Sequence, residues 1–369
     1  MVGKRVGKLE WYQTMRMTKE ERVTATLNCE PTDRPPIYDL IRNDAAIEYF
    51  ARQPIDMRSP ERTVYAAYSA FADATKSSVR MPRIPGERIV IEGEEYVTQR
   101  WTEWKKREPS YDRRNTEERV ASQIKTLRQR RRELDRFVGH YIDDLNNKQA
   151  ALADTVVFPN LPNTGCGLYS AYLFCGGVES FSYFMYDSPD LAEELIFENL
   201  SYTTDFLDRL PSDFAPPAVI VAEDIGGRNG PMFSPKYLSK TLYPGLKQVA
   251  KKCHERRTRL ILHSDGDLNL VIDDLVDCGI DGLHPLESLA GMSVSDLRKR
   301  YPKLVLLGGI DCSQLLPFAS AEDVAAAVMC NVKAAGYGYF VGSSGEINNE
   351  VPLRNVIALY ETVMRIGDA

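Results

Sequence analysis

The sequence predicts an α/β fold, a (β/α)8 TIM barrel preceded by an N-terminal helical arm, and three observations support this class. Short runs of β-branched and aromatic residues recur after residue 150, capped helical segments lie between them, and polar or ionisable residues follow nearly every run. Nearly continuous apolar strands that alternate with helices indicate a parallel sheet covered by helices. Chemistry collected from the C-terminal ends of many strands is typical of a barrel.

The first elements are predicted from residues 1–40. A capping box at residues 18–21 begins a short helix that ends at Asn28, and Pro35 and Pro36 then interrupt the chain. Residues 37–40 are expected to form the first strand. Further on, residues 116–136 predict a charged helix whose basic run at 128–132 forms a solvated face. We divide the chain into a helical arm, residues 1–34, and a barrel domain, residues 35–369.

The later elements carry clearer signals. Helices are expected to begin at Ser188-Pro189 and Ser234-Pro235, where a capping hydroxyl precedes a proline, and at Ser320, where Asp323 completes a capping box. Gly279 and Gly336 stand where helices end and strands begin. The predicted strands cover residues 155–158, 218–222, 259–262, 279–283, 304–307 and 337–341.

Composition and charge exclude several classes of protein. The 369-residue chain is 43% hydrophobic and 27% charged, with a formal net charge of −6, as in ordinary globular proteins. It lacks both the ~18-residue apolar run of a membrane helix and the apolar segment of a secretory signal. Seven dispersed cysteines without a C-x-x-C pair are typical of reduced thiols. We therefore expect a cytoplasmic protein that does not bind a membrane. We also expect no nucleic acid as partner, because the basic run at 128–132 lacks interleaved aromatic residues.

Ionisable side chains at the strand ends are the candidates for chemistry. His263 and Asp265 lie two residues apart in an extended segment, so both can approach one metal ion or one substrate group. A histidine that is only hydrogen-bonded to a carboxylate at a strand end is an equally good interpretation. Further acids follow other strands, namely Glu223, Asp224, Asp311 and Glu346. Only one of the adjacent pair Glu223 and Asp224 is expected to face the site. Such a set suits a divalent metal or general acid–base catalysis.

Three uncharged or weakly basic side chains at strand ends, Asn160, His284 and Ser343, are candidates for substrate binding. Trp101 and Trp104 offer aromatic faces on which an aromatic substrate could stack, although packing in the core is the more common role of such residues.

Several motifs together resemble the uroporphyrinogen decarboxylase superfamily, which also contains corrinoid-dependent methyltransferases. They are Thr18-Lys19-Glu20-Glu21 with Asp33-Arg34-Pro35, Glu223-Asp224-Ile225-Gly226, His263, Gly282-Leu283-His284-Pro285, Leu307-Gly308-Gly309-Ile310-Asp311 and Pro352-Leu353-Arg354-Asn355. The resemblance covers residues 18–40 loosely and about 155–366 well. It implies a barrel with its site at the C-terminal strand ends, and it suggests a homodimer.

The decarboxylase branch of this superfamily needs no cofactor and holds a polycarboxylate substrate with an R-Q-A-G-R element. Here the matching stretch is Arg42-Asn43-Asp44-Ala45-Ala46, which keeps the first arginine and loses the second. That change weakens the case for a highly anionic tetrapyrrole. In this alternative, decarboxylation of uroporphyrinogen or a related carboxylated pyrrole, Arg42 binds carboxylates and Asp224 holds the pyrrole N–H groups. A non-catalytic protein that binds a tetrapyrrole or corrinoid is a third interpretation.

The methyltransferase branch binds zinc through H-x-C and a later cysteine. His263 matches the histidine, but Asp265 replaces the first cysteine, and Gly345 or Glu346 stands at the second. Oxygen ligands are harder than thiolates and suit an oxygen-bearing substrate. We therefore expect methyl transfer from a small methylated compound, such as an aryl methyl ether, to a corrinoid carried by a separate partner protein. His263 and Asp265, with Glu346 or Glu223, are expected to hold the metal, zinc, while Asp224 and Asp311 are the candidate catalytic acids.

Overall fold

The computed structural model describes residues 16–91, 94–105 and 111–367, and its centre is a five-stranded parallel sheet. The strand order is β13-β12-β11-β10-β7, and neighbouring strands are parallel throughout. The strands are β7 (Ala218–Ala222), β10 (Arg259–His263), β11 (Gly282–Leu286), β12 (Val305–Ile310) and β13 (Tyr339–Ser343). In this register His263 lies between Ala222 and His284. The parallel α/β class predicted from the sequence is confirmed.

Two parallel strand pairs and three single bridges lie on either side of this sheet. The pairs are β2 (Ala74–Lys76) with β6 (Val156–Phe158), and β1 (Ile41–Arg42) with β14 (Ile347–Asn348). The bridges join Ile37 to Val341, Tyr38 to Ala74 and Asn160 to Ile220. The predicted strand at 37–40 is thus reduced to two bridges. The segment at 37–38, β2 and β6 run parallel to the central strands, so the C-terminal ends of these strands lie on one side of the molecule.

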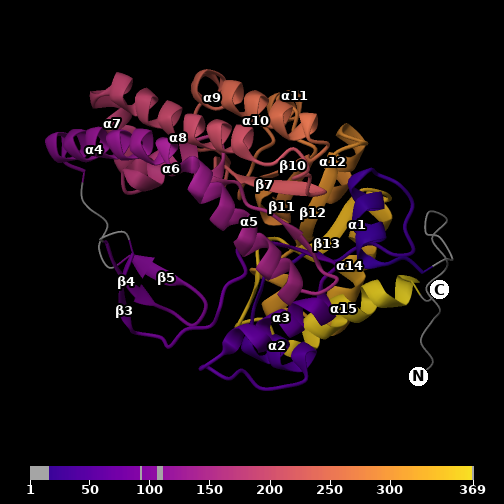
Figure 1. The fold of residues 1–369 in the computed structure, drawn as a ribbon. Helices are drawn as coiled ribbons and strands as arrows, with labels where there is room; N and C mark the ends of the chain where they lie inside the picture. Colours follow the sequence, from indigo (N-terminus) through magenta and orange to yellow (C-terminus); the bar gives the residue numbers. More distant parts are fainter. Residues whose placement is uncertain (1–15, 92–93, 106–110, 368–369) are drawn as a thin grey trace.

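Helices lie on the outside of the strands, with α8 and α10 on one flank and α2, α3 and α15 on the opposite flank (Figure 1). In chain order the helices are α1 (Lys19–Leu27), α2 (Asp44–Ala51), α3 (Pro60–Phe71), α4 (Arg113–Arg132), α5 (Leu134–Ala151), α6 (Leu168–Phe174), α7 (Val178–Asp187), α8 (Pro189–Arg209), α9 (Pro235–Thr241), α10 (Tyr243–Glu255), α11 (Ile272–Asp277), α12 (Val294–Arg300), α13 (Leu315–Phe318), α14 (Ala321–Ala335) and α15 (Leu353–Gly367). None of these helices is both long enough and apolar enough to cross a membrane.

Short elements complete the described chain. An antiparallel meander of β3 (Arg88–Ile91), β4 (Glu94–Thr98) and β5 (Glu103–Lys105) follows β2. A small hairpin of β8 (Gly226–Gly227) and β9 (Gly230–Pro231) follows β7, and the 3-10 turns are η1 (Pro162–Thr164) and η2 (Ser288–Ala290).

Alternation along the strands separates two apolar clusters. On β7, Ala218 and Ile220 belong to an inner cluster, whereas Val219 and Val221 belong to the larger cluster beneath the helices. The inner cluster also contains aromatic side chains of three other segments, Tyr38, Phe158 and Phe340. Successive strand residues point to opposite faces of the sheet. A residue two positions after a member of the inner cluster therefore points to the same side as that cluster and lies nearer the C-terminal end of the strand. The polar residues at such positions lie directly next to the inner cluster, which we call the apolar floor.

All three predicted helix starts are confirmed, and two of the three serines form the capping hydrogen bond. Ser234 accepts a hydrogen bond from Tyr237 N, and Ser320 forms a capping box with Asp323. Ser188 makes no capping bond, because its hydroxyl instead donates to Glu117 of α4. Pro189 still occupies the first turn of α8, where a proline loses no helical hydrogen bond.

The basic run on α4 is largely exposed, as the sequence predicted, and two of its arginines also form ion pairs. Arg128 and Arg131 contact the acids of α8. Arg128 donates to Glu198 at 2.8 Å, and Arg131 reaches the same carboxylate at 3.1 Å. Glu198 is 4% exposed, so these arginines satisfy a buried acid.

A buried ion cluster attaches α1 to the rest of the fold. The predicted capping box at Thr18 is present, and Arg22 on the following turns pairs with Asp33 and Asp73, each at 2.6 Å. Asp73 also accepts from Arg34 and from Ile37 N. Residues 1–15 of the predicted arm lie outside the described residues, and the division at residue 34 stays a prediction.

Candidate functional site

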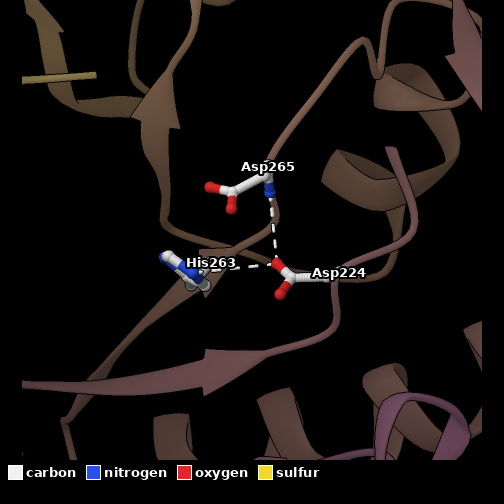
Figure 2. A group of neighbouring side chains, drawn as sticks. All are labelled: Asp224, His263 and Asp265. Atoms are coloured by element: carbon white, nitrogen blue, oxygen red, sulfur yellow. Dashed lines mark hydrogen bonds and ion pairs between the residues drawn. The ribbon is translucent and has the colours of Figure 1, made fainter. Parts of the chain in front are cut away.

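Asp224, His263 and Asp265 come together at the C-terminal ends of β7 and β10 (Figure 2). His263 is the last residue of β10, and the two aspartates lie two residues beyond their strands. One potential ligand atom from each side chain lies within 4.8 Å of the others. His263 Nε2 is 3.7 Å from Asp224 Oδ1, and the backbone N–H of Asp265 donates to the same oxygen at 3.2 Å. The juxtaposition of His263 and Asp265 matches the expectation from their spacing.

Glycines allow the two loops that carry the aspartates to pack closely. A Cβ at Gly226 would lie 2.2 Å from the carbonyl oxygen of Asp265. Gly266 has a φ of +84°, and a Cβ there would lie 2.5 Å from Gly226 C. Such distances exclude any side chain at either position, so the glycines bring the Asp224 and Asp265 loops into contact.

His284 on β11 fixes the orientation of His263. Their Nδ1 atoms are 2.7 Å apart and their rings stack with centroids separated by 4.9 Å. One Nδ1 must donate and the other accept, so the Nε2 of His263 is left facing Asp224. Loss of hydration, with the charges of Lys76 and Arg42, lowers the pKa of His263 to about 4 against the opposing effect of Asp224. His263 is therefore neutral at pH 7, which is the form that binds metal ions.

Asp265 presents its carboxylate to this cluster. Loss of hydration and the negative charges of Asp224 and Glu287 raise its pKa to about 7. No described residue donates a hydrogen bond to this carboxylate in the structure. Two aspartates that repel one another beside a neutral imidazole are stabilised by a cation, so the electrostatics of the cluster favour a positively charged ligand.

The structure corrects the prediction that Glu223 binds a metal. Glu223 is fully buried, and its carboxylate accepts N–H bonds from Cys166, Gly167 and Tyr169 at 2.7 to 2.8 Å. Adjacent residues at the end of a strand point to opposite faces, so Glu223 faces the helices while Asp224 faces the cluster. Glu223 holds the loop before α6.

Asp311 also serves the backbone. Its carboxylate accepts from Ser313, from Gln314 N and from Leu315 N, so it holds the turn that leads into α13. Loss of hydration acts to raise the pKa of Asp311, but these hydrogen bonds outweigh it and lower the pKa below its usual value. A carboxylate held in this way stabilises the turn before α13, and Asp311 is not among the converging residues, so its role as a catalytic acid stays a prediction.

Glu346 is engaged by Arg42. The two side chains form a close ion pair, and Glu346 is not among the three residues whose ligand atoms converge. The predicted role of Glu346 in completing the metal shell therefore stays a prediction, because the structure pairs it with Arg42 outside the cluster. The pairing also neutralises the arginine that the resemblance assigns to substrate carboxylates.

Other predicted substrate residues have structural partners. Ser343 donates its hydroxyl and its N–H to Asp39, both at 2.7 Å, and is 1% exposed. Trp101 is 5% exposed and donates its indole N–H to Asp44 at 2.8 Å, so it packs in the core beside α2. These contacts correct the substrate predictions for both residues. Asn160 accepts a hydrogen bond from Ser77 and keeps its predicted role as a hypothesis. His284 orients His263, as described above.

Three residues near the cluster were missed from the sequence. Tyr172 on α6 donates its hydroxyl to the carbonyl of Asp224 at 2.8 Å. Burial and the charge of Asp224 raise the pKa of Tyr169 on the same helix, which places both tyrosines beside the cluster. Lys76, the last residue of β2, lies within the electrostatic influence of Asp265 and Glu346. Tyr169 and Tyr172 could have been predicted as site residues, because they lie one helical turn apart after a predicted strand. Lys76 could not, because β2 has no apolar run by which to recognise it as a strand.

The model for the family described as uroporphyrinogen decarboxylase (URO-D) matches residues 168–366, which is more than half of the chain. The chain belongs to this family. A solved methyltransferase from Methanosarcina mazei covers 95% of this chain and 99% of its own at a TM-score of 0.62, with 14% sequence identity. At that identity the similarity shows a shared fold.

A structure from Listeria monocytogenes, provisionally assigned as a vitamin-B12 independent methionine synthase, covers 63% of this chain and 69% of its own. It has 12% identity and a TM-score of 0.33, which is too low to indicate a common fold. No curated protein sequence matches the chain significantly.

Proposed function

We propose that this protein is a metal-dependent methyltransferase that moves a methyl group from a small O-methylated compound, such as an aryl methyl ether, to a corrinoid protein. The observation that carries the proposal is the convergence of His263, Asp224 and Asp265 at the strand ends. The fold shared with a methyltransferase supports it. The corrinoid is carried by a separate partner, because the chain has no D-x-H-x-x-G motif.

We also infer that the strands close into a (β/α)8 barrel with this site at its mouth. The bridges at Ile37, Tyr38 and Asn160 support closure, because they connect β13 to the segment at 37–38, that segment to β2, and β6 to β7. In such a barrel the C-terminal strand ends form the active site.

The donor set fits a divalent metal such as zinc. One imidazole nitrogen and two carboxylates, one of them without a hydrogen-bond donor among the described side chains, are ligands that such ions accept. A bound divalent ion would act as a Lewis acid on the oxygen that loses its methyl group. Asp224, His263 and Asp265 would hold it, and the second nitrogen of His263 is already held by His284.

The side chains of the chain have separate roles in this proposal. His284 keeps His263 oriented, and Tyr172 fixes the position of the Asp224 loop through its bond to the backbone. Tyr169 and Tyr172 provide aromatic faces beside the cluster, where Trp101 does not reach. Their aromatic faces suit an aryl substrate.

The direct test is a methyl-transfer assay on the purified protein before and after metal removal. The protein is mixed with a Co(I) corrinoid protein and a panel of aryl methyl ethers, and formation of methyl–cobalt is followed by absorbance. We expect activity that a chelator abolishes and added zinc restores. Full activity in protein shown by elemental analysis to be metal-free would contradict the proposal. Release of CO2 from uroporphyrinogen without methyl transfer would favour the decarboxylase instead.

His284→Ala is expected to weaken zinc binding by about 10- to 100-fold, because the variant removes the partner that orients His263. His284→Asn restores an acceptor near the position of Nδ1 and should recover much of that loss. Competition with a chromophoric chelator measures the affinities. Equal affinities in the wild type and both variants would show that His284 has no positioning role, and circular dichroism checks that each variant is folded.

A further inference from the structure

A cavity of about 670 Å³ lies at the N-terminal edge of the central sheet, the opposite edge from the metal cluster. Arg259 is the first residue of β10, and Asp281 directly precedes β11. Lys303 and Tyr337 stand two residues before β12 and β13, and residues 27–29 at the end of α1 also line the cavity. Its volume lies within the range of small-molecule binding sites. The proposed methyl transfer makes no use of it.

The charged residues that line this cavity are mostly basic. Arg259, Arg298 and Lys303 are the cations, and Asp281 is the one acid among the described residues of the lining. Asp281 is already engaged, because it pairs with Arg259 at 2.9 Å and with His254 at 2.7 Å. Arg259 and Asp281 therefore compensate each other, and the positive charges of Arg298 and Lys303 remain.

Arg298 and Lys303 contribute in different ways. The guanidinium of Arg298 donates to backbone carbonyls, such as those of Ala335 at 2.8 Å and Tyr337 at 2.7 Å, so it supplies charge. Loss of hydration lowers the pKa of Arg298, and no carboxylate of the described residues is among the groups that act on it. Lys303 supplies free donors, because no described residue accepts a hydrogen bond from its ammonium or forms an ion pair with it. Both features favour an anionic ligand.

Cys29 lies where the effects of these cations meet. Burial raises the pKa of its thiol, and the charges of Arg298, Arg259 and Lys303 oppose that effect. No carboxylate of the described residues is among the charges that act on this thiol. Its Sγ donates to the carbonyl of Lys303 at 3.4 Å. The three positive charges therefore act on one region of the cavity.

An adjoining pocket of about 360 Å³ extends this region, since it shares Asn28, Arg259 and Asp281 with the cavity. Thr258 and Arg257 also line this pocket. Thr258 is 3% exposed, and its hydroxyl has no hydrogen-bond partner among the described residues. A buried hydroxyl without a partner is costly, so it calls for an explanation such as a ligand. The two spaces together offer room for a molecule larger than an inorganic ion.

We propose that this cavity binds a dianionic phosphate group, held by the ammonium of Lys303 and by the charges of Arg298 and Arg259. A phosphate carries about −1.5 to −2 at neutral pH, which matches the two charges that Asp281 does not compensate, and it has three strong acceptor oxygens. The organic part of a phosphate monoester would extend into the adjoining pocket. The inference is independent of the proposed function, because the cavity shares no residue with the metal cluster.

The test is titration calorimetry on the full-length protein at constant ionic strength. The probes are glycerol phosphate, ribose phosphate and adenosine monophosphate, each with its dephosphorylated counterpart, together with inorganic phosphate and acetate. We expect at least one phosphate compound to bind, and Lys303→Gln to weaken that binding by about 10- to 100-fold, because hydrogen bonds to charged groups contribute that much. Lys299→Gln is the matched control, because Lys299 is 75% exposed on α12 and does not line the cavity. It should retain wild-type affinity.

A labelling experiment shows where the phosphate binds. Alkylation of Cys29 by N-ethylmaleimide, followed by peptide mass spectrometry, should slow when the tightest phosphate compound is present, and its dephosphorylated counterpart should have no effect. Cys330, an exposed cysteine on α14, is the internal control and should react at one rate throughout. In Lys303→Gln the same concentration of phosphate should no longer protect Cys29.

The two sources of the phosphate group give different results. An ester that binds more tightly than inorganic phosphate identifies a phosphate monoester as the ligand, whereas equal affinities identify the free ion. Three results would overturn the inference. They are the absence of binding by every phosphate compound, unchanged affinity in Lys303→Gln, or acetate that protects Cys29 as well as phosphate does. Circular dichroism checks that both lysine variants are folded. None of these measurements uses methyl transfer, so they leave the proposed function untouched.

Discussion

His263→Ala should lower methyl transfer by about a thousandfold and yield protein that purifies without stoichiometric zinc. His263 supplies the only nitrogen among the three converging ligands, and its Nε2 faces Asp224 because His284 occupies Nδ1. Metal Lewis-acid catalysis contributes several kcal/mol of transition-state stabilisation, and each ~1.4 kcal/mol is tenfold in rate. Initial rates of methyl–cobalt formation and elemental analysis of the same preparation measure the two effects.

His140→Ala is the matched control, because His140 is exposed on α5, outside the cluster. It should retain both metal and activity. If His263→Ala keeps full activity, or loses activity while retaining zinc at wild-type affinity, the assigned role of His263 is wrong. Circular dichroism separates loss of function from loss of fold.

Asp73→Ala should lower the free energy of unfolding by about 3–5 kcal/mol. Asp73 is 1% exposed and accepts hydrogen bonds from Arg22, Arg34 and the backbone of Ile37. Removing one partner of a buried ion cluster leaves the remaining charges desolvated and unpaired, which is the costly case. Urea unfolding followed by circular dichroism and by fluorescence measures the loss and shows whether the transition is cooperative.

A second acid that contacts α1 provides the comparison. Asp154 pairs with Lys19 at 2.8 Å, but its side chain is 69% exposed, so Asp154→Ala should cost no more than about 1 kcal/mol. Equal losses in the two variants would mean that burial of the Asp73 cluster does not determine its contribution. A small loss in Asp73→Ala alone would mean that Asp33 suffices to hold Arg22.

The fold was predictable where the strand signal is local. The apolar runs at β7 and β10 are long enough to identify a strand, and the spacing of His263 and Asp265 placed them on one face. β2 was not predicted from the sequence, because it has only three residues, Ala74–Lys76, and is stabilised by pairing with its parallel neighbours. Lys76 was missed for the same reason.

The roles of the acids were less predictable because they depend on distant backbone. Glu223 and Asp311 have the residue type and the strand-end position of catalytic acids. What distinguishes them from Asp224 is a set of N–H donors from loops whose conformation no local pattern specifies. Where a carboxylate meets several backbone donors, it stabilises a loop and is not free for chemistry.

The apolar floor beneath the strand ends also constrains the order of events during turnover. Tyr38, Phe158 and Phe340 pack together in the inner apolar cluster. In the proposed barrel this packing closes the route to His263 from the N-terminal side, so small molecules enter and leave from the C-terminal side. A protein partner that collects the methyl group has to approach from that same side. Under the proposed function the methyl donor therefore binds before the corrinoid protein docks, and the demethylated product departs only after the partner has left.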